Sequence, residues 1–291
     1  MENIDFDVPS DAELESWRSR ARYWRLPTLG ALELLRADFS TQRFRRHRHP
    51  GYAIGVVTRG AERFFCRGGH HVAEEAAIIA VNPGEVHDGE AARWDGWRYR
   101  MMYPTEEFMV SVARELWRGH TSPPKLVRPV IADRELASAF LEAHRAGEDA
   151  ASRLSAETGI LTFLATLLQR HSDVTGSQAP PAARETRHLQ RVLDFIDASL
   201  ALDLSLDTLA ETAGINRFHF LRIFNRTVGT TPHAYVTERR VARGKTLLAQ
   251  GFSVADAALA VGFFDQSHFA NRFRQTYGMT PRTFKLGWKG V

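Results

Sequence analysis

The chain has 291 residues, of which 44% are hydrophobic and 25% are charged, as in an ordinary globular protein of about two domains. Its single cysteine, Cys66, excludes an internal disulfide and a cysteine-rich metal site, which fits a reducing cytoplasm. The first fifteen residues hold six acids and no base, and no apolar stretch is long enough to span a membrane. We therefore expect neither a secretory signal nor a membrane partner.

The net charge of +4 is unevenly distributed along the chain. Residues 187–291 contain 14 lysines and arginines against eight acids, whereas the preceding residues carry a net charge of −2. A basic module joined to a slightly acidic one indicates that only the basic module binds a polyanion such as DNA.

Residues 32–103 contain short runs rich in Val, Ile, Phe and Tyr, separated by turn-forming residues. Several short strands at this spacing predict an antiparallel barrel or sandwich. The expected strands cover residues 52–58, 62–67, 77–81 and 97–103, with breaks at Gly60, Gly68-Gly69, Asn82-Pro83-Gly84 and Asp95-Gly96.

The pattern becomes helical over residues 133–170, where leucines seven residues apart form one apolar stripe. The stripe consists of Leu154, Thr158, Leu161, Leu164 and Leu168. It either packs on the β-domain of its own chain or mediates a homodimer, since two heptads are too few to establish a coiled coil. Residues 172–186 are rich in Ser, Pro, Gly and Ala and predict a flexible linker.

After this linker the sequence nearly repeats itself, which indicates an internal duplication. Six positions match at an offset of 49: His219-Phe220, Phe224, Gly229 and Thr231-Pro232 correspond to His268-Phe269, Phe273, Gly278 and Thr280-Pro281. Four upstream positions match at an offset of 48: Leu206, Leu209, Ala210 and Gly214 correspond to Val254, Ala257, Ala258 and Gly262.

Each copy has the boundary residues of a helix-turn-helix unit, which sets its second helix in the major groove of DNA. Ser, Thr, Asn and Asp side chains can cap helix N-termini, and a glycine in the left-handed conformation can end a helix. The expected N-caps are Ser205 and Ser253, the latter with Asp256 as capping-box partner, then Asn216 and Asp265, and the closing glycines are Gly214, Gly262, Gly229 and Gly278. Thr-Pro then opens another helix in each copy.

Helical periodicity assigns the two faces of each second helix. The predicted inward side chains are Phe220, Ile223, Phe224 and Thr227 in the first copy and Phe269, Phe273 and Thr276 in the second. The predicted outward side chains are Phe218, Arg222 and Asn225, then Ser267, Asn271 and Arg274. Arg binds guanine, Asn or Gln binds adenine, and Phe contacts a thymine methyl. The alternative is an ordinary solvated polar face, against which an outward Phe218 argues.

Residues 187–288 closely resemble the C-terminal domain of the AraC/XylS family of bacterial transcription regulators, most specifically in the stretch VADAALAVGFFDQSHFANRFRQTYGMTPRTFK. The resemblance implies two helix-turn-helix units joined by a long helix, about Pro232 to Gln250. It implies base contacts by Phe218, Arg222, Gln266, Ser267, His268 and Asn271, and phosphate contacts by Arg217, Arg226, Arg272, Arg274 and Lys285. Leu221 stands where the family often has a polar residue, so we do not expect it to read bases.

Three histidines in the first half form a candidate sensor site. Arg45, His47 and His49 alternate and so would share one face of a strand, and His87 follows the turn at Pro83-Gly84. The HRHP and NPGEVH stretches resemble the two histidine motifs of cupin barrels and the sensor domains of the AraC family. That resemblance implies that the three rings converge in one cavity.

A metal-binding cupin usually has a glutamate four or five residues after the second histidine, where this chain has Ala53 and Ile54. Three histidines can still bind zinc or another divalent ion. We favour instead hydrogen bonds inside the barrel or to an organic effector, and we expect no metal and no cofactor. Tyr52, Trp97 and Tyr99 are the expected aromatic walls of its site, with Trp94 as a further candidate. An arm from Trp17 to Trp24 is a candidate cover for the mouth.

These features predict an α+β chain. Residues 1–171 form a cupin-like barrel domain for effector binding and dimerisation, residues 172–186 the linker, and residues 187–291 an all-α DNA-binding domain. The predicted function is a cytoplasmic, sequence-specific transcription regulator that binds double-stranded DNA and a small-molecule effector as a homodimer, with RNA polymerase as a further candidate partner. We expect no enzyme activity; the alternatives are a cupin-type metal enzyme with an accessory DNA-binding module, and an architectural DNA binder without a ligand.

Overall fold

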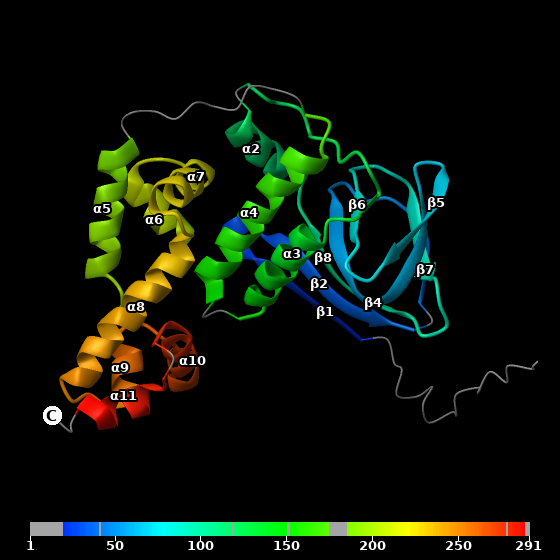
Figure 1. Cartoon of the computed structure of the whole chain (residues 1–291). Coiled ribbons are helices and arrows are strands. Elements are labelled where there is room, and N and C mark those ends of the chain that lie inside the picture. Colours follow the sequence, from blue (N-terminus) through cyan, green and yellow to red (C-terminus); the bar gives the residue numbers. More distant parts are fainter. Residues whose placement is uncertain are drawn as a thin grey trace, which may run out of the picture. The chain divides into compact units, whose positions relative to one another are not determined.

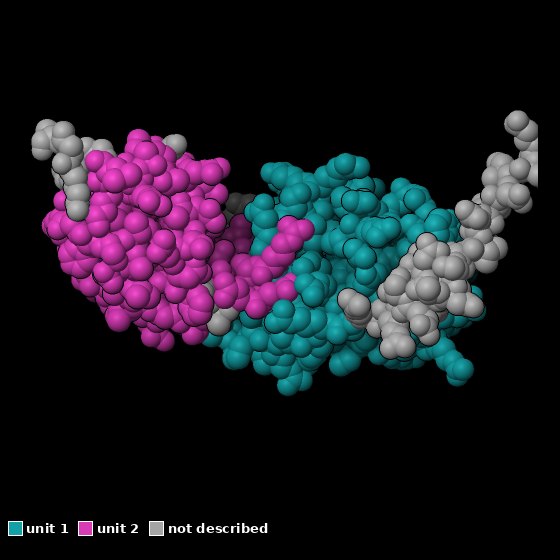
Figure 2. Space-filling view, turned by 90° about the horizontal axis from the view of Figure 1, so that it is seen from below, with its two compact units in different colours: residues 1–144, 163–177 teal, residues 145–162, 178–291 magenta. Residues whose placement is uncertain are grey.

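The computed structural model describes residues 20–40, 42–117, 119–149, 152–174, 185–277 and 279–288. The chain divides into two compact units, residues 1–144 with 163–177 and residues 145–162 with 178–291 (Figure 2). None of the helices in the described ranges combines the length and the apolar character needed to cross a lipid bilayer.

The first unit is built on antiparallel strands (Figure 1). In chain order they are β1 (Arg20–Leu26), β2 (Leu32–Phe39), β3 (Arg43–His47), β4 (Ala53–Cys66), β5 (Gly69–Glu74), β6 (Ile78–Val81), β7 (His87–Ala91), β8 (Trp97–Tyr103) and β9 (Val130–Ile131). One path of pairing runs β1-β2-β8-β4-β6-β9, and a second joins β3 to β7, with β7 and β5 both paired to β4. The predicted antiparallel β-domain is confirmed, while closure into a barrel stays a prediction.

Strand β4 belongs to both pairing paths. Its first half pairs with β6 and β8, and its second half, from Ala61 to Cys66, pairs with β5. The expected strand break at Gly60 is therefore wrong: the chain continues through it, and a register shift between Val57 and Arg59 absorbs the irregularity.

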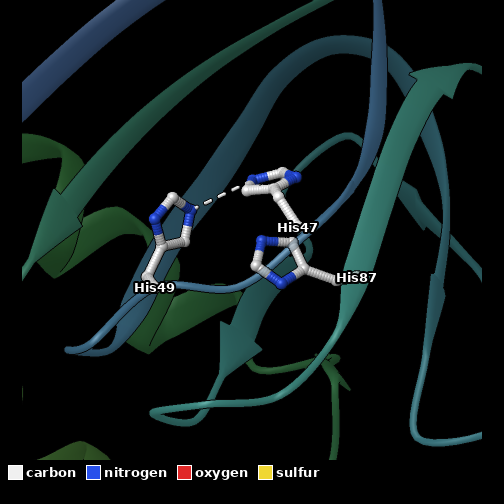
Figure 3. A group of neighbouring side chains, drawn as sticks. All are labelled: His47, His49 and His87. Carbon is white, nitrogen blue, oxygen red and sulfur yellow. Dashed lines mark hydrogen bonds between the residues drawn. The ribbon is translucent and has the colours of Figure 1, made fainter.

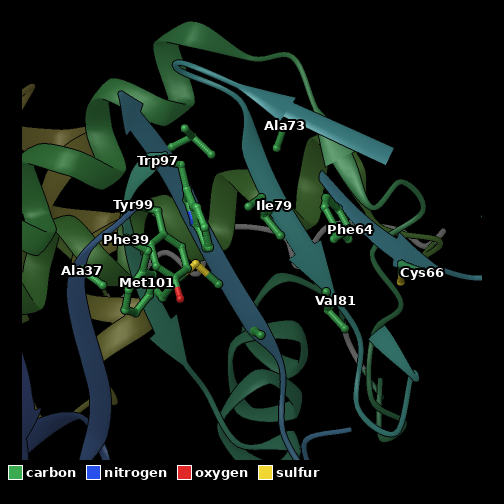
Figure 4. Packing of buried hydrophobic residues seen from close by; sticks show 12 residues of the cluster. Ala37, Phe39, Phe64, Cys66, Ala73, Ile79, Val81, Trp97, Tyr99 and Met101 are labelled. Atoms are coloured by element: carbon green, nitrogen blue, oxygen red, sulfur yellow. The ribbon is translucent and has the colours of Figure 1, made fainter. Parts of the chain in front are cut away.

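The core of this unit contains inward residues of β2, β4, β6 and β8 (Figure 4). Trp97, Tyr99 and Met101 alternate along β8, so all three point to one face of the strand and join this cluster. A short 3-10 turn (Pro27–Leu29) and helix α2 (Glu106–Leu116) complete the connections, and Thr105 caps α2 through the amide of Phe108.

Helix α3 (Arg134–Ala146) is fixed to β8 by a fully buried histidine. His144 Nε2 lies 3.0 Å from the carbonyl oxygen of Met101, which can only accept a hydrogen bond. The ring therefore holds its proton on Nε2, and Nδ1 accepts from the Arg100 guanidinium at 3.0 Å.

Helix α4 (Arg153–His171) carries the predicted apolar stripe, and every member of that stripe is buried. Ile160, Phe163 and Leu167 lie off the stripe and are buried as well. The stripe is thus buried within its own chain, as one of the two alternatives predicts, and its residues are not exposed for dimerisation.

The second unit is helical, as predicted, apart from its turns. Its helices are α5 (Glu185–Ala198), α6 (Leu206–Ala213), α7 (Arg217–Val228), α8 (Pro232–Ala249), α9 (Val254–Ala260), α10 (Gln266–Tyr277) and α11 (Pro281–Trp288). Helix α5 begins inside the predicted linker, and residues 175–184 of that linker lie outside the described residues. Residues 145–162 group with this unit by compactness, whereas the predicted boundaries at 171 and 187 stay a prediction.

Candidate nucleic-acid interface and sensor site

The first helix-turn-helix unit consists of α6, a turn at Gly214 and α7. Ser205 caps α6 by accepting from the amide of Thr208, and Asn216 caps α7 by accepting from the amide of His219 at 2.9 Å. Gly214 ends α6 with a φ of 67°, and Gly229 ends α7 with a φ of 78°. The caps and closing glycines expected for this copy are all confirmed.

The second unit consists of α9, a turn at Gly262 and α10. Ser253 accepts from the amide of Asp256 at 3.0 Å and donates its hydroxyl to the Asp256 carboxylate at 2.6 Å. Asp265 caps α10 through the amide of His268, and Gly262 has the expected positive φ of 82° although Val261 is the residue that follows α9. Gly278, expected to close α10, lies outside the described residues.

The predicted core face of each second helix is correct except in its last turn. Phe220, Ile223 and Phe224 of α7 are buried, and so are the equivalent Phe269 and Phe273 of α10. Thr227 and Thr276, which were expected to point inward, are exposed. Both stand next to the last residue of their helix.

The predicted base-contacting residues differ in exposure between the two helices. On α10, Gln266, Ser267 and Asn271 are exposed, whereas the ring of His268 is half-buried with its centroid 5.1 Å from that of Phe263. On α7, Phe218 and Arg222 are both half-buried. Leu221, not expected to read bases, is 5% exposed and belongs to the core.

The predicted phosphate-contacting residues fall into two groups. Arg226 and Arg274 are exposed at the C-terminal ends of α7 and α10. Arg217 and Arg272 already contact other side chains, since Arg217 Nε lies 3.3 Å from Asp207 Oδ1 and Arg272 Nη1 donates to Gln275 Oε1. Lys285 Nζ donates to the carbonyl oxygens of Gly251 and Phe252, so it also holds the turn after α8.

In the first unit, the structure brings the three predicted histidines together (Figure 3). His47 ends β3, His49 follows it, and His87 begins β7. One ligand nitrogen from each ring lies within 4.8 Å of the others, and His47 Nε2 lies 3.2 Å from His49 Nε2. The predicted convergence of the rings therefore holds in this geometry.

Arg45 does not share the face of the histidines, contrary to the alternation in the sequence. Arg45 is exposed, while the ring centroids of Phe44 and His47 lie 6.3 Å apart. The pairing of β3 with β7 shifts register between Phe44 and His47, and this irregularity breaks the strict alternation of sides.

Backbone carbonyl groups orient two of the three rings. His47 Nδ1 lies 2.7 Å from the Arg45 oxygen, and His87 Nδ1 lies 2.9 Å from the Glu85 oxygen. Burial lowers the pKa of His49 to about 4, with repulsion from the other two rings as a further cause, and burial also lowers the pKa of His87. These two rings are therefore neutral at neutral pH.

Of the aromatic residues predicted to line the effector site, two lie in the core and one lines a cavity. Trp97 and Tyr99 are buried in the core cluster, while Phe44 lies between Trp97 and His47, with ring centroids 6.3 Å from each. Tyr52 is fully buried and donates its hydroxyl to the Pro124 oxygen at 2.7 Å. Trp94 is 75% exposed and forms no wall. Trp17 lies outside the described residues, and the rest of the proposed arm from Arg20 on is strand β1.

A cavity of about 610 Å³ adjoins His49, one of the three histidines. His49, Tyr52 and Tyr103 line it together with the ion-paired side chains of Arg25 and Glu33. Its volume is in the range of small-molecule sites.

Glu62, a buried acid on the core side of β4, was not among the predicted site residues. Burial raises its pKa to about 8, so the carboxyl is mostly protonated at neutral pH. An acid at an inward position beside Phe64 and Cys66 was the available signal, because a strand of alternating sides should have an apolar residue there.

Comparison with known proteins decides the family. Residues 29–164 match the AraC-like ligand binding domain, and residues 209–286 match a helix-turn-helix domain. The transcriptional activator AarP of Providencia stuartii is 32% identical over 103 residues, which cover 35% of this chain and 76% of AarP. The chain belongs to the AraC/XylS family of transcription regulators.

Two further relatives of this AraC/XylS chain differ in extent. An uncharacterized transcriptional regulator of Bacillus subtilis, YbfI, is 28% identical over 81% of this chain and 85% of its own length. A XylDLEGF operon transcriptional activator of Pseudomonas putida is 33% identical over 45% of this chain and 41% of its own length. The first of these similarities extends over both units.

Proposed function

We propose that this chain is a sequence-specific DNA-binding transcription regulator controlled by a small molecule bound in its first unit. The observation that carries the proposal is the pair of capped second helices, α7 and α10, each with polar side chains on the face away from its core. Such helices bind the major groove, and exposed Gln and Asn side chains recognise adenine. The family and the named regulators among its relatives support the same function.

Base contacts are proposed for Phe218, Arg222, Gln266, Ser267, His268 and Asn271, and phosphate contacts for Arg217, Arg226, Arg272, Arg274 and Lys285. Among the residues proposed for phosphate contacts, Arg226 and Arg274 have exposed side chains. Lys285 retains at most part of its donor capacity, since two backbone carbonyl groups already accept from it.

The effector site is proposed in the 610 Å³ cavity next to the histidines. Two features support it: His49, Tyr52 and Tyr103 lie on its wall, and residues 29–164 match a ligand-binding family. A homodimer, RNA polymerase contacts and a cytoplasmic location remain part of this proposal, and no catalysis is proposed.

The test measures binding of the full-length chain to fragments of its own promoter region by fluorescence anisotropy. We expect Kd to rise with salt along a straight line on logarithmic axes, because displaced counterions dominate phosphate contacts. Arg274→Ala should reduce affinity for all fragments and make the slope shallower by about 1. Gln190→Ala, an exposed position on α5, is the matched control. A chain that binds no fragment better than unrelated DNA would refute the proposal.

A further inference from the structure

We propose that His47, His49 and His87 bind a divalent transition-metal ion such as Zn²⁺. This deepens the proposed function at its sensor site, but it concerns metal binding and is tested separately from DNA binding. The missing carboxylate ligand of cupins favours an organic effector at the level of the sequence. The positions of the ring protons in the folded chain favour a metal.

The first step is the tautomer of two rings. His47 Nδ1 and His87 Nδ1 each face a backbone carbonyl oxygen, which has no proton to give. Each Nδ1 must therefore be the donor, and each Nε2 of a neutral ring carries a lone pair. A metal-binding histidine characteristically donates its second ring nitrogen to a carbonyl in this way.

The second step is the shortage of protons in the cluster. His49 Nε2 can give one proton, and it lies 3.2 Å from the lone pair of His47 Nε2. His87, which is 8% exposed, then presents its own Nε2 lone pair without a hydrogen-bond donor among the described residues. With the proton of His49 on Nδ1 instead, three Nε2 lone pairs converge, and one cation satisfies all three at once.

The third step is the spacing of the nitrogens. Ligands about 2.05 Å from a tetrahedral Zn²⁺ are about 3.3 Å apart. The 3.2 Å between His47 Nε2 and His49 Nε2 matches that separation, and all three ligand nitrogens lie within 4.8 Å of one another. Small side-chain rotations would bring His87 to bonding distance.

The chemistry of the ligands selects the ion. Three neutral imidazoles suit Zn²⁺, Ni²⁺ or Cu²⁺ and suit Mg²⁺ or Ca²⁺ poorly, since those ions prefer oxygen. Three protein ligands leave the fourth position of a tetrahedral ion for water or another donor. His49 lines the 610 Å³ cavity, so we infer that an oxygen or nitrogen atom of the effector takes this position.

The experiment uses the untagged full-length chain, freed of metal with a chelator and dialysed. Zn²⁺ or Co²⁺ is added, unbound ion is removed, and metal per chain is measured by inductively coupled plasma mass spectrometry. We expect one ion per chain, together with the visible absorption bands of tetrahedral Co²⁺. His47→Ala and His87→Ala should each weaken binding about 100-fold or more, because each removes a ligand.

His70→Ala is the matched control, because His70 is an exposed histidine of the same unit outside the cluster. Circular dichroism checks the fold, and His49→Gln, at a half-buried position, serves where an alanine variant does not fold. Less than stoichiometric metal in the parent chain, or equal affinity in parent and cluster variants, overturns the inference. DNA binding is measured on the same samples: metal binding without DNA binding would refute only the proposed function, and the reverse only the metal site.

Discussion

The two helix-turn-helix units have equivalent core residues, and they differ in the residues that pack against their turns. Phe220 and Phe224 of α7 pack with ring centroids 5.4 Å apart, and the equivalent Phe269 and Phe273 of α10 pack at 5.7 Å. Each leading helix is capped by a serine, Ser205 or Ser253. The duplication visible in the sequence is therefore also a duplication of packing and of helix boundaries.

The turns differ in their surroundings. A Cβ added at Gly214 would meet no atom within 4 Å, whereas one added at Gly262 would lie 2.4 Å from the carbonyl oxygen of Leu200 and 3.0 Å from the Arg240 guanidinium. That guanidinium donates to the oxygens of Leu200 and Leu202. The second turn is thus packed against the loop before α6, and the first turn is open.

The leading helices also differ in what satisfies their first amides. The first amide of α6, that of Leu206, donates to the carboxylate of Glu157 on α4 at 2.9 Å. Glu157 is 1% exposed and also accepts from Arg153 Nε. In the described part of α9 no buried acid has this role, and Ser253 with Asp256 forms an exposed cap instead. The same capping serine in the sequence is therefore accompanied by a buried acid at α6 and by an exposed cap at α9.

The largest expected effect is at the packed turn. Gly262→Ala should lower the free energy of unfolding by about 2–5 kcal/mol, because the left-handed conformation costs an alanine about 1–2 kcal/mol and the overlap with Leu200 adds about 1–3. Gly214→Ala, with a φ of 67° but open space, should cost only about 1–2 kcal/mol. Urea unfolding of the full chain, followed by circular dichroism, measures both, and equal losses would contradict the difference between the turns.

The next effect is confined to the first helix-turn-helix unit. Glu157→Ala removes the acceptor of the Leu206 amide and leaves that buried group unpaired, which should cost about 1–3 kcal/mol. Hydrogen exchange should quicken at the amide of Leu206 and not at that of Val254 in α9. Glu211→Ala, an exposed acid on α6, is the control. Equal changes at both amides would show that Glu157 stabilises both helix-turn-helix units rather than α6 alone.

The sequence predicts what is local and misses what depends on distant contacts. Caps and glycine turns rest on residues three or four apart, and the N-caps expected at Ser205, Asn216, Ser253 and Asp265 are confirmed. Strands β5 and β7 went unrecognised, because their sequences GHHVAE and HDGEA are poor in β-branched and aromatic residues and are ordered by pairing with β4. Glu157 was overlooked for the same reason, since its partner lies 49 residues away.

The two helices proposed to contact bases, α7 and α10, should specify different base pairs of the DNA site. Arg222→Ala should weaken binding to the best site by about 1–3 kcal/mol and relax preference at one position, and Asn271→Ala should do the same at another position. Arg226→Ala, at an exposed position beyond the reading face, should weaken all sequences alike. Selection from a random DNA library gives the preferences of each variant. Uniform loss in Arg222→Ala would make that residue a phosphate contact.

The smallest effect compares the two capping serines. Ser205→Ala and Ser253→Ala each remove the acceptor of an N-terminal amide, that of Thr208 or Asp256, and should cost about 0.5–2 kcal/mol. Ser205 is only 6% exposed, so water cannot easily replace its hydroxyl as the acceptor. Ser253 and Asp256 are both exposed, so water can solvate the Asp256 amide when the Ser253 hydroxyl is removed. We therefore expect the larger loss for Ser205→Ala, measured as a difference in urea midpoint at constant slope. Substitution of each serine by Asp, which keeps an acceptor, should restore most of the stability; a larger loss at Ser253 would mean that exposure does not govern the strength of these caps.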